Sequence, residues 1–327
     1  MATIYYENDA DPATLAGQRI AVVGYGNQGR SWALNLRDSG CDVRVCVRRD
    51  ETRVQADAEG FDTADLEAAA DADIVCLLVP DDVIPRLPLE RPATGLTIVA
   101  SGYAPGFGRL RVAGDVGMVA PRMLGPEVRR CYEEGSGFIS AVGVHNDVSG
   151  RALVRTLAVA HAIGALRQGA IELTPHQEAV LDLAVEQVLS PALTRVQEAF
   201  VRTMLEHGIP LEAIMTEQIL SGEVERTYRL VREIGYAKQM EFHSPTSQYG
   251  QLSRRGAYDA LDFVPRMREL TDDIASGRFA DEWDAEAESG YASLRELKDR
   301  WCGPSVQSLE DAIRRRLGPG AQGGDSV

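Results

Sequence analysis

The chain has 327 residues, of which 44% are hydrophobic and 25% are charged, and this balance is typical of a folded globular protein rather than a disordered one. Its length exceeds the roughly 100–200 residues of a single typical domain, so we expect two domains. The formal net charge of -15 repels nucleic-acid backbones and anionic membrane surfaces, and we expect neither as a partner.

The first half of the chain alternates β-branched segments with helical ones. Residues 19–24 (RIAVVG) have the pattern of a buried strand that ends in glycine. Residues 27–40 follow as a helix, with Trp32 and Leu36 on its apolar face and Gly40 at its end. Further strands are predicted at residues 41–47, 71–79, 95–101 and 114–121. This alternation predicts a doubly wound parallel sheet, as in an α/β Rossmann domain.

The second half changes character at about His176, because β-branched runs give way to long stretches with a helical period of 3.6 residues. We expect this half to be all helical, with breaks at glycine, serine and proline. These breaks fall at residues 208–210, 221–222 and 244–245. The resulting division is a nucleotide-binding domain at residues 1–175, a helical domain at residues 176–318, and a glycine-rich tail at residues 319–327 that we expect to be disordered.

A GxGxxG motif stands between the first predicted strand and the first predicted helix, which is the context that favours dinucleotide binding. Gly24 permits a tight turn, Gly26 lets the backbone approach a pyrophosphate, and Gly29 lets the helix pack closely on the strand. The N-terminus of that helix presents free N–H groups to an anion. The expected dinucleotide-binding loop is Gly24, Tyr25, Gly26, Asn27, Gln28 and Gly29.

The end of the second predicted strand carries Arg48 and Arg49, about 20 residues after the glycine motif. An NAD enzyme usually places an acid there, on the adenosine ribose. Two guanidinium groups in that place favour a 2′-phosphate and therefore NADP. Asp50 and Glu51 follow directly, so use of both cofactors stays open, and a solvated basic turn is the alternative interpretation.

The chain resembles ketol-acid reductoisomerases from about residue 3 to residue 255. The resemblance begins with IYYENDADPATLAGQRIAVVGYGNQGRSWALNLRDSG and continues through CLLVPDDVIP, DLAVEQ and HSPTSQYG. It implies a domain that binds NADPH, with Pro80 among the cofactor contacts, Mg²⁺ ions, and a knotted helical C-terminal domain. It also implies a homodimer with a shared active site. Members of the family migrate an alkyl group in an acetohydroxy acid and then reduce the resulting keto acid.

Asp182 and Glu186 match the acidic pair that holds magnesium in the family. Their spacing of four residues places both on one face of a helix, where the two carboxylates repel each other. On an otherwise apolar helix this pair is costly unless a cation or a basic group compensates it. A solvent-facing acidic stripe is the alternative.

Three further positions follow from the resemblance. Glu217 matches an acid that helps to hold metal or substrate from the neighbouring subunit, and its partner is either Ser221 or Glu223. Ser244 matches a serine that hydrogen-bonds the substrate carboxylate, although a Ser-Pro pair is equally suited to a helix N-cap.

Two positions depart from the family pattern on the substrate side. Ser101 stands where the family has a histidine, and a serine hydroxyl cannot buffer a proton near neutrality. Arg122 stands where the family has a lysine, and arginine stays charged. We therefore expect an NADPH-dependent oxidoreductase that reduces a keto or imine group of a small carboxylate without obligatory alkyl migration. In this scheme Mg²⁺ polarises the substrate, and Arg122 fixes its carboxylate or stabilises developing charge.

Two other functions stay open: true ketol-acid reductoisomerase activity, and a regulator that binds cofactor without turnover. Retention of Asp182 and Glu186 argues against the regulator. The five cysteines are an odd number without a CxxC pair, which fits a reducing cytoplasm. No segment approaches the ~18 uninterrupted apolar residues that span a bilayer.

Overall fold

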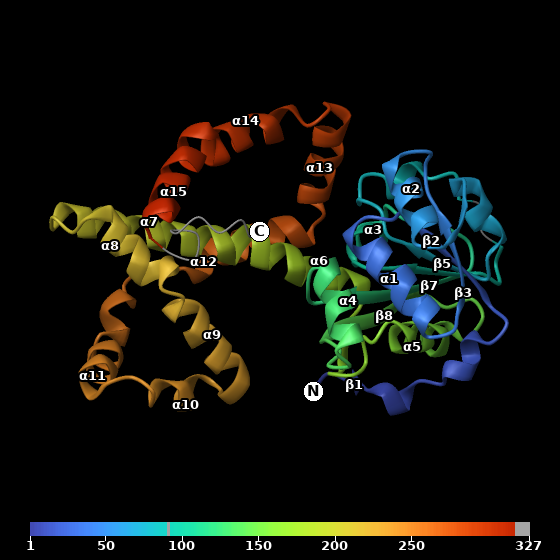
Figure 1. The fold of residues 1–327 in the computed structure, drawn as a ribbon, viewed down its shortest axis with the longest axis horizontal. Helices are drawn as coiled ribbons and strands as arrows, with labels where there is room; N and C mark the ends of the chain where they lie inside the picture. The colour runs from blue at the N-terminus through green and yellow to red at the C-terminus, as the bar shows by residue number, and fades with distance from the viewer. Residues whose placement is uncertain (90–91, 318–327) are drawn as a thin grey trace. The chain divides into compact units, whose positions relative to one another are not determined.

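The computed structural model describes residues 1–89 and 92–317 and contains two compact units. The first unit combines residues 1–183 with residues 274–283, and the second contains residues 184–273 and 284–317. Figure 1 shows the strands in the first unit and the helices of the second. The predicted tail at residues 319–327 lies outside the described residues.

The described part of the first unit is built on a nine-stranded sheet with the order β1-β9-β8-β7-β6-β5-β2-β3-β4. The six strands from β4 to β7 in this order all run parallel. Their order is that of a Rossmann domain, in which the chain starts in the middle and winds outward in both directions. The strands are β1 (Ile4–Tyr5), β2 (Arg19–Val23), β3 (Asp42–Cys46), β4 (Asp62–Ala64), β5 (Ile74–Leu77), β6 (Leu96–Val99), β7 (Asp115–Pro121), β8 (Ser140–Asn146) and β9 (Ala170–Glu172).

The sheet is not wholly parallel, which corrects the expectation from the sequence. β8 runs antiparallel to β7, and β1 runs antiparallel to β9. The predicted strands at β2, β3, β5, β6 and β7 are confirmed, whereas β1, β4, β8 and β9 carry no strand prediction. Three of these four strands have only two or three residues, too few to show a periodic pattern, and they form because a longer neighbour offers them hydrogen bonds.

Both faces of the sheet are buried, which explains the continuous apolar runs in the central strands. Along β2, Ile20 and Val22 join one hydrophobic cluster, and Ala21 and Val23 join another on the opposite face. On the first face, helices α1 (Asn27–Asp38), α4 (Gly125–Glu133) and α5 (Ala152–Ala162) contribute to the core, and Trp32 of α1 is fully buried there.

The opposite face is covered by short elements, among them the 3₁₀ helices η3 (Leu66–Asp71) and η4 (Ile84–Arg86) and the helix α3 (Tyr103–Gly106). The remaining elements of the first unit are η1 (Glu7–Asp9), η2 (Pro12–Leu15), α2 (Glu51–Ala58) and α6 (Pro175–Ala184). Two helices pass from one unit into the other along the chain, namely α12 (Val264–Ala275) and α13 (Arg278–Glu288).

The described part of the second unit is all helical, as the sequence predicts. Its elements are the π-helical segments η5 (Val185–Leu189) and η6 (Thr216–Leu220), the helices α7 (Ser190–Glu206), α8 (Leu211–Met215), α9 (Glu223–Ile234), α10 (Tyr236–Met240) and α11 (Pro245–Ser253), η7 (Arg255–Tyr258), α14 (Ala292–Cys302) and α15 (Pro304–Arg316). A helix ends shortly before each of the three predicted breaks, and another begins at or directly after it. In the described ranges no helix is both long and apolar enough to cross a membrane.

Candidate active site

The carboxyl ends of the six parallel strands bring most predicted site residues of the first unit to one edge of the sheet. β5 and β3 flank β2 on opposite sides, so the chain reverses direction across the sheet between β2 and β5. Ligands of open α/β sheets bind at the carboxyl ends of the strands, at such a switch point. The loops at this edge hold the glycine motif after β2, Arg48 and Arg49 after β3, Pro80 after β5, Ser101 after β6 and Arg122 after β7.

The glycine motif has the geometry that its chemistry requires. Gly24 has a φ of +96°, and a Cβ there would overlap the carbonyl oxygen of Leu78. A Cβ at Gly29 would overlap the carbonyl oxygen of Gly24, so helix α1 approaches the turn as closely as it does only because both residues are glycine. Gly26 is exposed at the N-cap of α1, and no atom lies within 4 Å of the place its Cβ would occupy. The loop therefore leaves the helix N-terminus open to an anion.

The side chains of the motif take different directions. Tyr25 is only 3% exposed, packs edge-on against Phe61 and donates a 2.5 Å hydrogen bond to Glu59. Burial, together with Glu59, raises the pKa of Tyr25. Gln28 donates from Nε2 to the carbonyl oxygen of Met123 at 3.1 Å, whereas Asn27 is exposed. Tyr25 therefore presents to a ligand only its main chain.

The two arginines after β3 are exposed and paired with carboxylates. Arg48, whose side chain is 82% exposed, lies 3.5 Å from Asp50. Arg49 pairs instead with Asp65, the first residue after β4, at 2.9 Å. Arg53 on α2 donates to the same carboxylate at 2.8 Å, and both arginines lower the pKa of Asp65 to about 2. No pattern in the sequence distinguishes Asp65 or Arg53, because β4 is too short to be predicted.

A partly buried ion-pair network ties α6 to the carboxyl edge. Arg122 donates from Nη2 to Glu178 at 2.6 Å and from Nη1 to Asp182 at 3.1 Å. The other oxygen of Glu178 accepts the main-chain N–H of Gly102 at 2.5 Å. Glu178 and Asp182 are four residues apart on α6, so one guanidinium group spans both. Glu178 is only 2% exposed, and it is a site residue that the sequence alone does not predict.

Negative charge accumulates around this network. Burial raises the pKa of Glu178, and Arg122 and the Gly102 N–H only partly offset that effect. Asp81, in the loop after β5, has its pKa raised to about 6 by burial and by the carboxylates of Glu178, Asp82 and Asp182. A region in which carboxylates raise one another's pKa values is one that a cation stabilises.

The donor chemistry at Asp182 and Glu186 suits Mg²⁺, which prefers carboxylate oxygens and usually keeps several waters, so that one or two protein carboxylates suffice. Within residues 1–89 and 92–317 no group of three or more His, Cys, Asp or Glu side chains is arranged to hold a metal ion. Asp182 is about half exposed, and one of its oxygens is occupied by Arg122. A bound cation would therefore compete with Arg122 for this carboxylate.

Glu186 and Glu217 share a local setting that is not predicted from the sequence. Each is the second residue of a π-helical segment, Val185–Leu189 (VEQVL) and Thr216–Leu220 (TEQIL), and each is exposed. Such segments are rare and frequently occur at functional sites. The two segments share Glu, Gln and Leu at the same positions, and in both a π-helical turn carries an exposed glutamate.

The structure also resolves the local roles of the serines near these acids. Ser244 is the N-cap of α11, and its hydroxyl accepts the N–H of Ser247 at 3.3 Å. Ser221 follows η6 directly and accepts the N–H of Glu223 at 3.3 Å. Glu223 begins α9 after a turn at Gly222, so it does not continue the π-helical segment that carries Glu217.

Comparison with known proteins identifies the family. The sequence matches the profile "Acetohydroxy acid isomeroreductase, NADPH-binding domain" over residues 14–169 and the profile "Ketol-acid reductoisomerase, C-terminal domain" over residues 176–317. The chain belongs to the ketol-acid reductoisomerase family.

Similar proteins extend over nearly the whole chain. The "Ketol-acid reductoisomerase (NADP(+))" of Caldivirga maquilingensis is 38% identical, over 98% of this chain and 100% of that protein. The "Ketol-acid reductoisomerase (NAD(P)(+))" of Metallosphaera sedula is 36% identical, over 97% of this chain and 96% of that protein. The solved structure of an "NADH-preferring ketol-acid reductoisomerase from an uncultured archean" is 28% identical, with a TM-score of 0.85 over 96% of this chain and 98% of that one.

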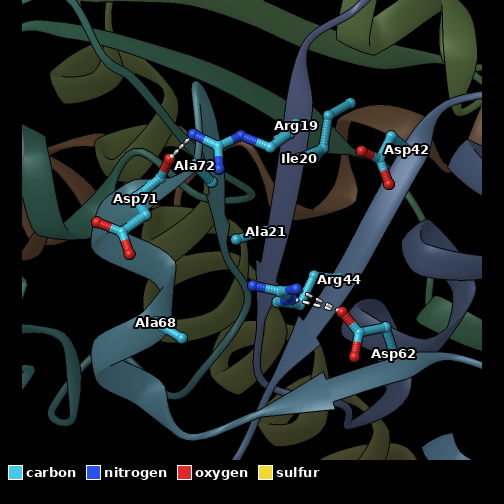
Figure 2. A pocket seen from close by; sticks show the side chains of 9 residues that line it. All are labelled: Arg19, Ile20, Ala21, Asp42, Arg44, Asp62, Ala68, Asp71 and Ala72. Carbon is cyan, nitrogen blue, oxygen red and sulfur yellow. Dashed lines mark hydrogen bonds and ion pairs between the residues drawn. The ribbon is translucent and has the colours of Figure 1, made fainter.

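A hollow in this member of the ketol-acid reductoisomerase family lies at the opposite, amino-terminal end of β2 and β3. Figure 2 shows that charged side chains line it, with Arg44 paired to Asp62 at 2.6 Å and Arg19 donating to the carbonyl oxygen of Asp71 at 2.6 Å. Both arginines of this hollow thus have hydrogen-bond partners within the chain. Because ligands of such sheets bind at the carboxyl ends of the strands, this hollow is separate from the candidate active site.

Proposed function

We propose that this protein is an NADPH-dependent ketol-acid reductoisomerase, which migrates an alkyl group in an acetohydroxy acid and reduces the resulting keto acid. The relatives that carry this name are 36–38% identical over 97–98% of the chain, which favours the complete reaction over the reduction without migration that the substituted residues first indicated. The observation that carries the proposal is the contact of Arg122 with Asp182, because it holds a carboxylate of α6 at the edge where the glycine motif lies.

The nucleotide half of the site consists of the glycine motif and the arginines. The main-chain N–H groups at the start of α1, next to Gly26, bind the pyrophosphate, and Arg48 and Arg49 bind the 2′-phosphate. The side chain of Tyr25 stabilises the loop from within the core by its hydrogen bond to Glu59. Pro80 is exposed at the end of β5, on the side of the switch point where the nicotinamide half is expected.

The substrate half combines charges of both signs. Asp182 and Glu186 hold Mg²⁺, with Glu217 contributing from a second copy of the chain. When bound, this ion supplies Lewis-acid polarisation of the substrate oxygens, and the reduced nicotinamide supplies hydride. Arg122 binds the substrate carboxylate or stabilises charge that develops in the reaction, and Glu178 holds its guanidinium group in place.

Two residues complete the substrate half. Ser101 is partly exposed, and its hydroxyl, which accepts the N–H of Tyr103 at 3.2 Å, keeps a hydrogen to donate to a substrate oxygen. Ser244 can donate its hydroxyl hydrogen to a substrate carboxylate while its oxygen caps α11, because a cap uses only the acceptor.

Reduction without alkyl migration remains a second candidate, because Ser101 and Arg122 replace the family's histidine and lysine. Neither hydroxyl nor guanidinium exchanges a proton readily near neutral pH. The migration step requires proton movement between substrate oxygens, so these two replacements should slow it more than they slow the reduction.

We further propose that the protein works as a homodimer. Helix α7 has 17 residues and none of them is buried. Leu193, Val196 and Phe200 lie on one face of this helix and are 44–55% exposed. An apolar helix face of this kind requires a partner, and a second copy of the chain supplies one. Phe200→Glu should yield monomers in light scattering, whereas Val54→Glu, which alters a still more exposed apolar position of the first unit, should not.

The function is tested by following NADPH oxidation with acetolactate, with 3-hydroxy-3-methyl-2-oxobutanoate, and with a panel of keto acids and imines, each with and without Mg²⁺. Turnover of acetolactate that requires Mg²⁺ is the expected result. Turnover of 3-hydroxy-3-methyl-2-oxobutanoate or another panel member, but not of acetolactate, establishes the second candidate instead. Tight NADPH binding without turnover of any compound would indicate that the protein is a regulator that binds cofactor.

A further inference from the structure

The residue after β4 lies next to the place where the 2′-phosphate is expected. β4 pairs with β3 in parallel register, with Ala64 opposite Cys46, and the N–H of Val47 donates to the carbonyl oxygen of Ala64 at 3.0 Å. Asp65 and Arg48 therefore leave the same edge of the sheet from neighbouring strands. This juxtaposition brings a carboxylate into a cluster of guanidinium groups.

Asp65 holds two of these guanidinium groups at once. Oδ2 of Asp65 accepts from Nη2 of Arg49 at 2.9 Å, and Oδ1 accepts from Nη2 of Arg53 at 2.8 Å. Arg53 is also anchored by a 2.9 Å hydrogen bond to the carbonyl oxygen of Val47, and its side chain is only 18% exposed. The very low pKa of Asp65 reflects these two partners, so the carboxylate is ionised at every physiological pH.

We infer that Asp65 sets the preference between NADPH and NADH, because its carboxylate competes with the 2′-phosphate for Arg49 and Arg53. This inference rests on the proposed function, in which NADPH binds at the carboxyl edge. NADH has only a ribose hydroxyl at that position and leaves the two ion pairs intact. NADPH must displace Arg49 from Asp65, or bind beside an uncompensated negative charge.

A carboxylate among arginines can also help a phosphate to bind, by holding the guanidinium groups in place. Magnitudes decide between the two effects. The side chains of Arg49 and Asp65 are 80% and 48% exposed. An exposed ion pair of this kind changes an equilibrium constant by at most about fivefold, so the positioning effect on phosphate binding is small. Repulsion between one carboxylate and a phosphate of nearly two charges amounts to about a tenfold factor at roughly 6 Å in water. Competition therefore outweighs positioning.

The test compares three variants of the full-length protein by titration with NADPH and with NADH at 50 mM salt. Asp65→Asn removes the charge and preserves the shape, and Asp65→Glu keeps the charge. Asp62→Asn is the matched control, because Asp62 is the first residue of β4, which Asp65 follows, and it also pairs with an arginine, in the hollow at the amino-terminal end of β2 and β3 (Figure 2).

We expect Asp65→Asn to bind NADPH about 5- to 10-fold more tightly, with NADH affinity changed less than twofold and the gain reduced at high salt. Asp65→Glu and Asp62→Asn should each stay within about twofold of the wild-type preference. Weaker NADPH binding by Asp65→Asn, or equal changes for both cofactors, would overturn the inference alone. Failure of the wild-type protein to bind NADPH would overturn the proposed function, and the inference with it.

Discussion

Removal of the Glu178 carboxylate tests directly how α6 is held at the carboxyl edge. Glu178 accepts one hydrogen bond from the Gly102 N–H and another from Arg122, and its side chain is 2% exposed. Glu178→Ala leaves a buried main-chain donor without an acceptor and leaves Arg122 with Asp182 alone. Because Asp182 is about half exposed, it compensates the guanidinium charge only in part.

The expected loss of stability follows from these contacts. Breaking a buried ion pair from one side typically costs about 3–5 kcal/mol, and a buried N–H without a partner costs about 1–3 kcal/mol. The two effects share one carboxylate, so their free energies do not add fully. Burial also raises the pKa of Glu178, so the buried charge itself is unfavourable and its removal recovers part of the loss. We expect Glu178→Ala to lower the free energy of unfolding of the first unit by about 3–4 kcal/mol. Glu178→Gln should cost about half as much, because its amide oxygen still accepts the Gly102 N–H.

Urea denaturation followed by circular dichroism, with native-state hydrogen exchange of the peptide that contains Gly102, measures this effect. A local loss of 3 kcal/mol speeds exchange by about two orders of magnitude, since about 1.4 kcal/mol corresponds to a factor of ten. Glu67→Ala, at an exposed glutamate of the same unit, is the control and should change the free energy by less than about 0.5 kcal/mol. If Glu178→Ala changed neither the unfolding free energy nor the exchange of that peptide, the network would not be what holds α6.

Three other predictions follow from the geometry. Gly29→Ala places a Cβ against the carbonyl oxygen of Gly24, so a titration should show dinucleotide affinity reduced at least about tenfold; an unchanged affinity would contradict the close approach. Burial raises the pKa of Asp115, but hydrogen bonds from Ser149 and other donors outweigh it and leave the pKa below its ordinary value. Its stabilisation is therefore present above about pH 4 and is lost as pH falls through the lowered pKa. Asp115→Asn should lower the melting temperature more at pH 7 than at acidic pH below about 4, and an equal decrease at every pH would refute this linkage. Calorimetric titration with MgCl₂ should show that Asp182→Asn lowers the affinity for Mg²⁺ roughly 10-fold. The same affinity in the variant and the wild-type protein would assign the ion to other residues.

Local patterns in the sequence were sufficient for the elements that carry their own signal. The strands β2, β3, β5, β6 and β7 are apolar or β-branched runs, and each is where the sequence predicts it. Gly24 and Gly29 specify the nucleotide loop, because their turn and helix contact are possible only without a Cβ. The helical second half and its breaks also follow from periodicity, glycine and proline. These features depend on residues that are neighbours along the chain.

Tertiary structure decided which distant residues act together. Gly102 and Glu178 are 76 residues apart and meet only because α6 packs against the edge of the sheet, so no local pattern distinguishes Glu178 from an ordinary polar residue of an amphipathic helix. Asp65 meets Arg49 because a three-residue strand finds a longer neighbour to pair with. The sequence by itself determined the family, the positions of five of the parallel strands and the nucleotide motif. The packing of the folded chain determined which charges compensate one another, because a buried ion pair depends on distance in space and not on spacing along the chain.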